Sequence, residues 1–294
     1  MTTLTLQAPA KINLYLAVTG KRPDGYHTLR SLFCPVGLAD TVSLKPTGDR
    51  ISVSCNHPVV PTDRTNLAYV AARAFLDRTR INSGLHIHIH KRIPVAGGLG
   101  GGSSNAAAVL KGLNRFYQSP LSGRQLHTLA ATIGADVPFF LDCAAAWAAG
   151  VGDQLTPAKD ISSLPVILVN PGVPLATAQI FKKLNLRLTK CTQKHKNLSF
   201  KKLLSNQGHA LCNDLEPAAV KQCPAIADIK TRLLQLGAAG AMMSGSGPTV
   251  FGLFYKKVTA RRAFDQLAAS AAGALFLTTL RGSRFKKDVC EKII

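Results

Sequence analysis

The sequence predicts an α/β protein of the α+β type with two domains, and three observations lead to this fold class. Its 294 residues are enough for two domains of ordinary size. Segments that alternate apolar and polar residues, as strands do, are interspersed with segments whose apolar residues recur at helical spacing. The stretch Gly150–Pro157 is marked by glycine and proline. We therefore expect a first domain at residues 1–157 and a second at residues 158–294.

The first domain begins with strand patterns. Lys11–Val18 alternates with period two, so Lys11 and Asn13 should lie together on the face opposite the apolar residues. A turn by composition, Arg22–Gly25, then leads to an aromatic pair. Before the glycine-rich stretch described next, we expect strands at Leu4–Leu6, Thr41–Leu44, Ile51–Cys55 and Leu85–Ile89, and an amphipathic helix at Asn66–Phe75.

The glycine-rich stretch Pro94–Asn105 has five glycines within six positions. Glycines raise the backbone entropy lost on folding, so they do not serve a core. A strand pattern precedes the stretch, and a helical pattern capped by Ser103 or Ser104 follows it. A strand, a glycine loop and a helix N-terminus together present free N–H groups and a positive helix dipole, which suit phosphate.

The elements after this loop complete the α+β pattern. We expect a helix at Gln125–Ile133, a helix cap at Asp136, and a helix capped by Thr177 that contains Phe181. The basic run that ends at Lys202 is expected to be a loop. The remaining elements are strands at Val166–Val169, Val250–Tyr255 and Ala274–Leu280, helices at Ile226–Leu236 and Thr259–Ala272, and a second glycine-rich turn at Met243–Thr249.

Composition restricts the class of protein. No segment supplies about 20 continuous apolar residues, and no signal peptide is recognisable, so we expect no membrane association. The seven cysteines are scattered without a Cys-x-x-Cys pair, which argues against a disulfide framework or zinc site and favours the cytoplasm. The histidines at 86, 88 and 90 alternate on one strand, and a solvated face is a better interpretation than a metal site.

The net charge of +21 and the lysine-rich runs raise the hypothesis of a nucleic-acid-binding module. Charge alone, however, speaks to solubility and steering rather than to activity. Aromatic residues make up only 6% of the chain and do not alternate with the basic runs, as they do in proteins that stack bases. We therefore treat nucleic-acid binding as the alternative.

The glycine loop fails the common phosphate-binding templates. No lysine follows its glycines, as a Walker A loop requires, and Ser103 occupies the third glycine position of the dinucleotide template Gly-x-Gly-x-x-Gly. The His-Arg-Asp and Asp-Phe-Gly signatures of protein kinases are absent from the sequence.

Three stretches together resemble the motifs of the GHMP small-molecule kinases: Ala8–Leu14, Pro94–Ser104 and Met243–Thr249. Three more, Lys21–His27, Gly134–Phe139 and Asn213–Glu216, resemble the branch of that family that phosphorylates the 2-hydroxyl of 4-diphosphocytidyl-2-C-methyl-D-erythritol in non-mevalonate isoprenoid biosynthesis. The matches are collinear over nearly the whole chain. The loop departs from the common family pattern at Ala96 and Asn105.

The resemblance implies a fold and a catalytic pair. The N-terminal domain would resemble the second domain of ribosomal protein S5, and the C-terminal domain would be ferredoxin-like. The cofactors would be ATP and Mg²⁺. Asp136 matches the catalytic aspartate and Lys11 its partner lysine. The chemistry agrees, because phosphoryl transfer needs alignment, charge stabilisation and a carboxylate that accepts the hydroxyl proton.

The same resemblance assigns binding residues. Tyr26 and Phe181 would sandwich the cytosine ring, His27 would read its polar edge, and Asn13, with Thr177 beside the helix of Phe181, would help to hold the substrate. The nucleotide would be bound by Asn66 near the adenine and, along the loop, by Pro94, Val95, Ala96, Gly97, Gly98, Leu99, Gly100, Gly101, Gly102, Ser103 and Ser104. The resemblance assigns no metal ligands.

Two alternatives stay open besides the nucleic-acid module. Another GHMP kinase, acting on homoserine or mevalonate, would keep the loop but would have no use for a cytosine clamp. An inactive relative is disfavoured because Lys11 and Asp136 are both present. The sequence does not indicate an oligomeric state.

Overall fold

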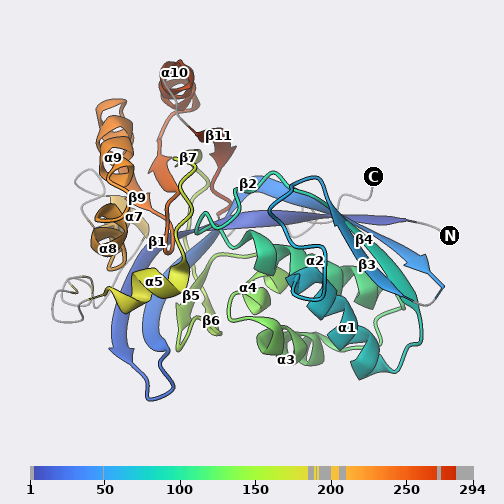
Figure 1. Cartoon of the computed structure of the whole chain (residues 1–294). Coiled ribbons are helices and arrows are strands. Elements are labelled where there is room, and N and C mark those ends of the chain that lie inside the picture. Colours follow the sequence, from blue (N-terminus) through green and yellow to red (C-terminus); the bar gives the residue numbers. More distant parts are fainter. Residues whose placement is uncertain are drawn as a thin grey trace.

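The computed structural model describes residues 3–48, 50–184, 189, 191, 200–204, 210–269 and 273–282. Among these residues, no helix is both long and apolar enough to cross a membrane. The fold consists of two sheets, each covered by helices (Figure 1).

The first sheet is built around two long antiparallel strands, β1 (Leu4–Lys21) and β2 (His27–Thr47), which run through the whole molecule (Figure 1). Its strand order is β3-β4-β2-β1-β8, and β5 pairs with both β2 and β6. The shorter strands are β3 (Ile51–Cys55), β4 (Gly84–His90), β5 (Ala146–Ala149), β6 (Gln154–Pro157) and β8 (Cys212–Asn213).

Four helices cover one face of this sheet (Figure 1). They are α1 (Leu67–Thr79), α2 (Gly101–Phe116), α3 (Gly123–Ile133) and α4 (Val137–Asp142). The alanine-rich face of α2 lets the helix lie close to the sheet, where it packs on Leu44 and Ile87. A Cβ at Gly112 would lie only 2.4 Å from Leu44 Cδ1, which shows how close this approach is.

The second sheet is antiparallel with the order β11-β7-β10-β9. Its strands are β7 (Pro165–Asn170), β9 (Gly240–Met243), β10 (Val250–Leu253) and β11 (Ala274–Thr279). The helices on this side are α5 (Thr177–Lys182), α7 (Phe200–Leu204), α8 (Glu216–Val220), α9 (Ala225–Gln235) and α10 (Lys257–Ala268). The two-domain α+β fold is therefore as expected.

A shared core joins the two sheets. Ile12 and Leu14 of β1 pack in one buried cluster with Leu168 of β7 and Phe251 of β10. In addition, β8 comes from the second half of the chain but pairs with β1. The predicted domain limit between residues 157 and 158 stays a prediction.

Most elements lie where the sequence placed them, but two of the expected helix caps, those of α2 and α5, were wrong. The N-cap of α2 is Gly100, not Ser103 or Ser104, because Gly100 adopts φ 70° and the helix begins directly after it. The N-cap of α5 is Ala176, and the Thr177 hydroxyl instead hydrogen-bonds Ser246 at 2.8 Å. Asp136 does occupy the N-cap position of α4, but its side chain makes no capping bond.

The expected loop up to Lys202 was also wrong at its end, where α7 buries Phe200, Leu203 and Leu204 in the shared core. The lysine-rich residues 192–199 lie outside the described residues, as do 283–294. The missed signal is the apolar spacing of Phe200, Leu203 and Leu204.

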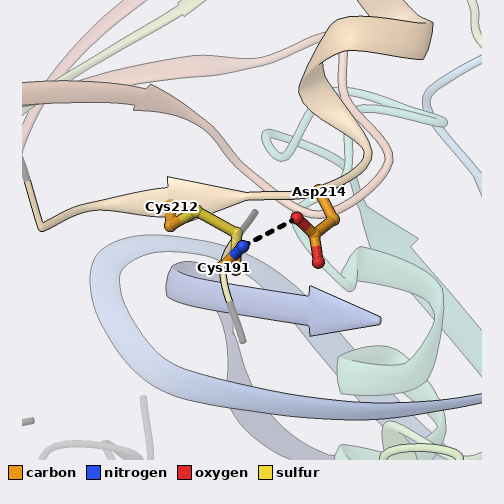
Figure 2. A group of neighbouring side chains, drawn as sticks. All are labelled: Cys191, Cys212 and Asp214. Atoms are coloured by element: carbon orange, nitrogen blue, oxygen red, sulfur yellow. Dashed lines mark hydrogen bonds between the residues drawn. A yellow bond between two sulfur atoms is a disulfide. The ribbon is translucent and has the colours of Figure 1, made fainter. Parts of the chain in front are cut away.

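The cysteine pattern argued against a disulfide framework, but the structure contains one disulfide among the described residues. Cys191 and Cys212 form a disulfide across 21 positions of sequence, and Figure 2 shows them beside Asp214. The Asp214 carboxylate accepts hydrogen bonds from the amides of Cys191 at 3.2 Å and Val18 at 2.9 Å. Sequence spacing could not reveal the pair, because the two cysteines meet at β1, where Tyr15 pairs with Cys212 and its hydroxyl donates to the Cys191 carbonyl at 2.7 Å. The disulfide removes the cysteine-based argument for a reducing compartment.

Candidate active site

A cavity of about 500 Å³ lies between the two halves of the chain. The first half contributes Lys11, Asn66, Asp136 and the loop from Pro94 to Ser103, while the second contributes Thr177, Phe181 and the turn at Gly245. A larger hollow of about 830 Å³ between β3 and α1 contains none of the predicted site residues. The structure thus brings most of the predicted site residues to one cavity.

The glycine loop is held between β1 and the second glycine-rich turn. The Lys11 amide donates to the Leu99 carbonyl at 3.0 Å, and the Ser244 hydroxyl donates to the Gly98 carbonyl at 3.0 Å. Gly98 adopts φ 74°, and a Cβ there would lie 2.2 Å from the Ser244 carbonyl oxygen. Only glycine fits this close approach. Glycines in the two glycine-rich motifs therefore allow the two backbones to pack closely against each other.

The N-terminus of α2 points its first amides at the cavity, which Gly101, Gly102 and Ser103 line. Amides of a first helical turn have no intrahelical acceptor and carry the positive end of the helix dipole. Ser104 differs from these three, because it is buried and does not line the cavity. Its hydroxyl has no hydrogen-bond partner among the described residues. The start of α2 therefore has the features of an anion cradle, with Ser103 at the cavity and Ser104 outside its lining.

Lys11 and Asp136 face each other across the cavity. The Lys11 ammonium lies 3.6 Å from Asp136 Oδ2, 2.7 Å from Asn13 Oδ1 and 4.5 Å from the centroid of the Phe33 ring. The Lys11 side chain is 6% exposed and that of Asp136 is 32% exposed, so the carboxylate remains open to a ligand. This arrangement can present a carboxylate to a hydroxyl beside a fixed positive charge.

Asn13 is occupied within the protein. Its Nδ2 donates to the Ser31 hydroxyl at 2.8 Å, its Oδ1 accepts from Lys11, and its amide donates to the Ser244 hydroxyl at 3.3 Å. Ser31 in turn donates to the Tyr15 carbonyl at 2.6 Å. Asn13 lines the cavity, but these bonds direct its polar atoms to Lys11 and Ser31.

Of the predicted cytosine residues, Phe181 lines the cavity and is in contact with His27. His27 stacks on Phe181 with centroids 5.1 Å apart and an interplanar angle of 28°. Burial, and secondly the charge of Lys21, lower the pKa of His27. Tyr26 is 67% exposed, and neither it nor His27 lines the cavity. The structure therefore pairs Phe181 with His27 and leaves Tyr26 at the surface.

Asn66 lines the cavity as the N-cap of α1. Its Oδ1 accepts from the Ala68 amide at 2.9 Å, and its Nδ2 donates to the Pro61 carbonyl at 2.6 Å. These bonds fix the chain that borders the cavity on this side.

Two polar residues beside the site received no role from the sequence: Asp40, which was missed altogether, and Asn213, which was noted only as part of a motif. Asp40 is fully buried at the base of the glycine loop, where it pairs with Lys91. Asn213 donates to the carbonyls of Met243 at 2.9 Å and Gly245 at 2.8 Å, and so holds the second turn. The available signal for Asp40 was an acidic residue inside the apolar pattern of β2.

Comparison with known proteins identifies the family. The model of the GHMP kinases N terminal domain matches residues 66–143, and that of the GHMP kinases C terminal matches residues 188–273. The 4-diphosphocytidyl-2-C-methyl-D-erythritol kinase of Pelobacter propionicus is 46% identical over 268 residues, which cover 91% of this chain and 95% of the relative. The chain belongs to the 4-diphosphocytidyl-2-C-methyl-D-erythritol kinase family of GHMP kinases.

Further comparisons agree with this GHMP kinase assignment. The kinase of the same name from Syntrophotalea carbinolica is 45% identical over 92% of this chain and 96% of the relative. A crystal structure of 4-(cytidine 5'-diphospho)-2C-methyl-D-erythritol kinase has TM-score 0.79 and 36% identity, and the match covers 94% of this chain and 98% of that one. The homoserine kinase from Cytophaga hutchinsonii, 18% identical with TM-score 0.73 over 96% of both chains, shares the fold.

As a GHMP kinase, the chain is a small-molecule kinase that uses ATP. The site fits such a nucleotide, because the glycines and the start of α2 form an anion cradle that added Cβ atoms would fill. A Cβ at Gly101, for instance, would lie 2.9 Å from the Lys91 ammonium. Among the described lining residues, Asp136 alone carries a carboxylate, and Ser103 offers a hydroxyl.

Other candidate metal ligands do not form a metal site. The described residues contain one candidate group, which combines Asp214 with Cys191 and Cys212, and the disulfide occupies both of its sulfurs. His86 and His88 hydrogen-bond Ser52 and Ser54 on the neighbouring strand β3. Among the described residues, the candidate magnesium ligands are therefore those that line the cavity.

Proposed function

We propose that this chain transfers the γ-phosphoryl group of ATP to the 2-hydroxyl of 4-diphosphocytidyl-2-C-methyl-D-erythritol, as a step of non-mevalonate isoprenoid biosynthesis. The observation that carries the proposal is the Lys11–Asp136 pair, 3.6 Å apart, in the same cavity as the glycine cradle. The substrate is that of the kinases to which the chain is similar.

In this mechanism Asp136 is the general base. Its carboxylate is partly exposed and accepts the proton of the attacking hydroxyl, a role worth about 10² to 10⁴ in rate. The Lys11 ammonium lies beside the carboxylate and stabilises the negative charge that develops on the attacking oxygen. Asn13 accepts a hydrogen bond from Lys11 and so positions it, rather than contacting the substrate through its own amide.

The phosphates of ATP would lie at the start of α2. The amides of Gly101, Gly102 and Ser103 are the donors, and their helix dipole attracts the negative charge. Mg²⁺ would be held mainly by the phosphates themselves, with the Ser103 hydroxyl and the Asp136 carboxylate as candidate protein ligands, and it would neutralise phosphate charge. Asn66 and its neighbour Pro61 would border the adenine.

The cytidine would bind at the His27–Phe181 end of the cavity. The two rings are already in contact, so the cytosine would stack on the free face of Phe181 or under the exposed ring of Tyr26. A neutral His27 can both donate and accept a hydrogen bond, as the polar edge of cytosine requires. Thr177, fixed by Ser246, would hold the chain next to Phe181.

The decisive experiment measures phosphate transfer from γ-labelled ATP by the full chain. The acceptors are the cytidine diphosphate substrate, the same methylerythritol without its cytidine part, homoserine and mevalonate. We expect transfer to the first acceptor only. Faster transfer to homoserine or mevalonate would contradict the proposal in favour of another GHMP kinase. Salt-dependent binding of random oligonucleotides without turnover would instead support the nucleic-acid alternative.

A further inference from the structure

Asp40 is a buried carboxylate whose hydrogen-bond partners all come from the two ends of the glycine loop. The residue is 0% exposed, in the middle of strand β2. Its Oδ1 accepts from the amides of Arg92 and Ile93, both at 2.8 Å. Its Oδ2 accepts from the Lys91 ammonium and from Asn105 Nδ2 at 2.9 Å. The carboxylate therefore accepts four hydrogen bonds.

These four donors bracket the phosphate cradle. Lys91, Arg92 and Ile93 form the chain that enters the glycine loop after β4, whereas Asn105 lies in the first turns of α2 after the loop. The entering chain has a second anchor in Asn56, whose Oδ1 accepts from the Lys91 amide at 2.7 Å, but the bonds of Asp40 reach the chain on both sides of the loop. The Asp40 carboxylate thus binds the chain before the loop and the helix after it, and so helps to set the distance between the two ends of the loop.

The negative charge of Asp40 also compensates the positive charge of Lys91, which is buried at the N-terminus of α2. The Lys91 ammonium is 5% exposed and lies at the start of α2, where a Cβ on Gly101 would come within 2.9 Å of it. A cation at a helix N-terminus opposes the helix dipole, so a buried Lys91 needs the carboxylate beside it. With that charge neutralised, the first amides of α2 keep their aim at the cavity.

We propose that Asp40 is a positioning residue for the nucleotide, which sets the geometry of the glycine cradle through Lys91 and Asn105. The inference deepens the proposed kinase function and rests on it for the identity of the acceptor. Asp40 does not line the cavity and does not contact the reacting atoms. Its effect is on ATP binding, because it acts on the donors that receive the phosphates and not on the Lys11–Asp136 pair.

The test is the variant Asp40→Asn, assayed for both substrates and by calorimetric titration with ADP. The amide keeps the shape but places N–H groups against donors, so we expect the KM for ATP and the Kd for ADP to rise tenfold or more. The acceptor KM and kcat should change less than threefold. A merely structural defect would lower the active fraction, hence kcat, and leave both KM values unchanged. Because ADP titration needs no acceptor, it also separates this inference from the identity of the substrate.

The matched control is Asp214→Asn, a carboxylate that is 7% exposed, does not line the cavity, and accepts the backbone amides of Val18 and Cys191, neither of which belongs to the loop. It should lower the unfolding midpoint without raising the Kd for ADP. If Asp40→Asn does not fold, Asn105→Ala removes one of the four donors and should raise that Kd about threefold. The inference would be overturned if Asp40→Asn, or Asn105→Ala in its place, bound ADP as tightly as the wild-type chain. It would also be overturned if Asp214→Asn lost as much affinity for ADP as the tested variant.

Discussion

The ammonium of Lys11 lies 3.6 Å from the carboxylate of Asp136, although 125 positions of sequence separate the two residues. Lys11 comes from the long strand β1 and Asp136 from the N-cap of α4. The cap makes no side-chain bond to its own helix, so its carboxylate is available to Lys11 and to a substrate hydroxyl.

Replacing Asp136 should therefore affect chemistry more than binding. For Asp136→Asn we expect kcat to fall by about 10² to 10⁴, with little change in either KM, because the general base is lost while the cavity keeps its shape. Asp142→Asn is the matched control, since the exposed Asp142 lies at the other end of α4 and pairs with the half-buried His127 at 3.3 Å. Steady-state kinetics on both variants provide the check, and an active Asp136→Asn enzyme contradicts the assigned role.

Gly98 and Gly102 should respond oppositely to alanine. Gly98→Ala places a Cβ against the Ser244 carbonyl at a positive φ, so we expect the free energy of unfolding to fall by at least about 1–3 kcal/mol and ATP binding to weaken. At Gly102 the nearest atom to an added Cβ is Leu67 Cδ1 at 3.6 Å, and helix propensity favours alanine by up to about 1 kcal/mol. Denaturant unfolding compares the two, and equal losses would show that the close approach at Gly98 does not matter.

Alanine substitutions at the adjacent Ser103 and Ser104 should have different effects on ATP binding and on stability. Ser103→Ala removes a hydroxyl from the cavity lining and should raise the KM for ATP about two- to tenfold. Ser104→Ala removes a buried hydroxyl without a partner among the described residues, so it should leave that KM unchanged and stabilise the fold by about 1 kcal/mol. Kinetics and thermal unfolding test both, and a large KM effect at Ser104 would place its hydroxyl at the phosphates after all.

The pH dependence of substrate binding should report on His27. Burial and Lys21 lower the pKa of His27, so the ring stays neutral to a lower pH than an ordinary histidine, which titrates near about 6.5. The unfolded chain then binds more protons, and the stability that a neutral His27 contributes is lost as pH falls through its lowered pKa.

We expect the acceptor KM to be constant above about pH 7 and to rise only below the ordinary histidine pKa of about 6.5. The KM for ATP should show no such step. His27→Asn keeps hydrogen-bonding groups and should remove the step. A step that persists in this variant would belong to another group.

The disulfide should contribute measurably to stability. Closing a loop across 21 positions between Cys191 and Cys212 is worth about 3 kcal/mol in the chain-entropy description. Addition of dithiothreitol should therefore lower the unfolding midpoint of the wild-type chain. The double variant Cys191→Ser, Cys212→Ser should already have the lower midpoint and should not respond to the reductant. Identical midpoints with and without reductant would show that the bond does not form in solution.

Local patterns predicted a large part of this molecule. The strand pattern of β1, the periodicity of α1 and α9, and the glycines of both turns are short-range features that the structure reproduces, although β1 is buried on both faces rather than on alternate residues. Residue propensities predicted two features wrongly. A glycine, Gly100, occupies the N-cap position for which a serine was expected, and the short helix α7 lies where the basic residues suggested a loop.

The candidate site was accessible to sequence reasoning only as separate motifs. Lys11, the glycine loop and Asp136 each carry a chemical signal in their residue types, and motif order tied them to one family. The partners of Asp40, the pairing of Cys191 with Cys212 and the stacking of His27 on Phe181 carry no such signal. They depend on which strands lie side by side.

The sequence by itself determined the α+β class, the family and the residue types that phosphoryl transfer requires, because these follow from periodicity and from motifs of a few residues. The family resemblance already paired Lys11 with Asp136, but only the tertiary structure gave the distance of 3.6 Å between them and decided that Gly98 meets Ser244 and that Ser104 does not line the cavity. These relationships arise when β1 and the second glycine turn pack against the same loop, and packing over more than a hundred positions leaves no trace in local residue spacing.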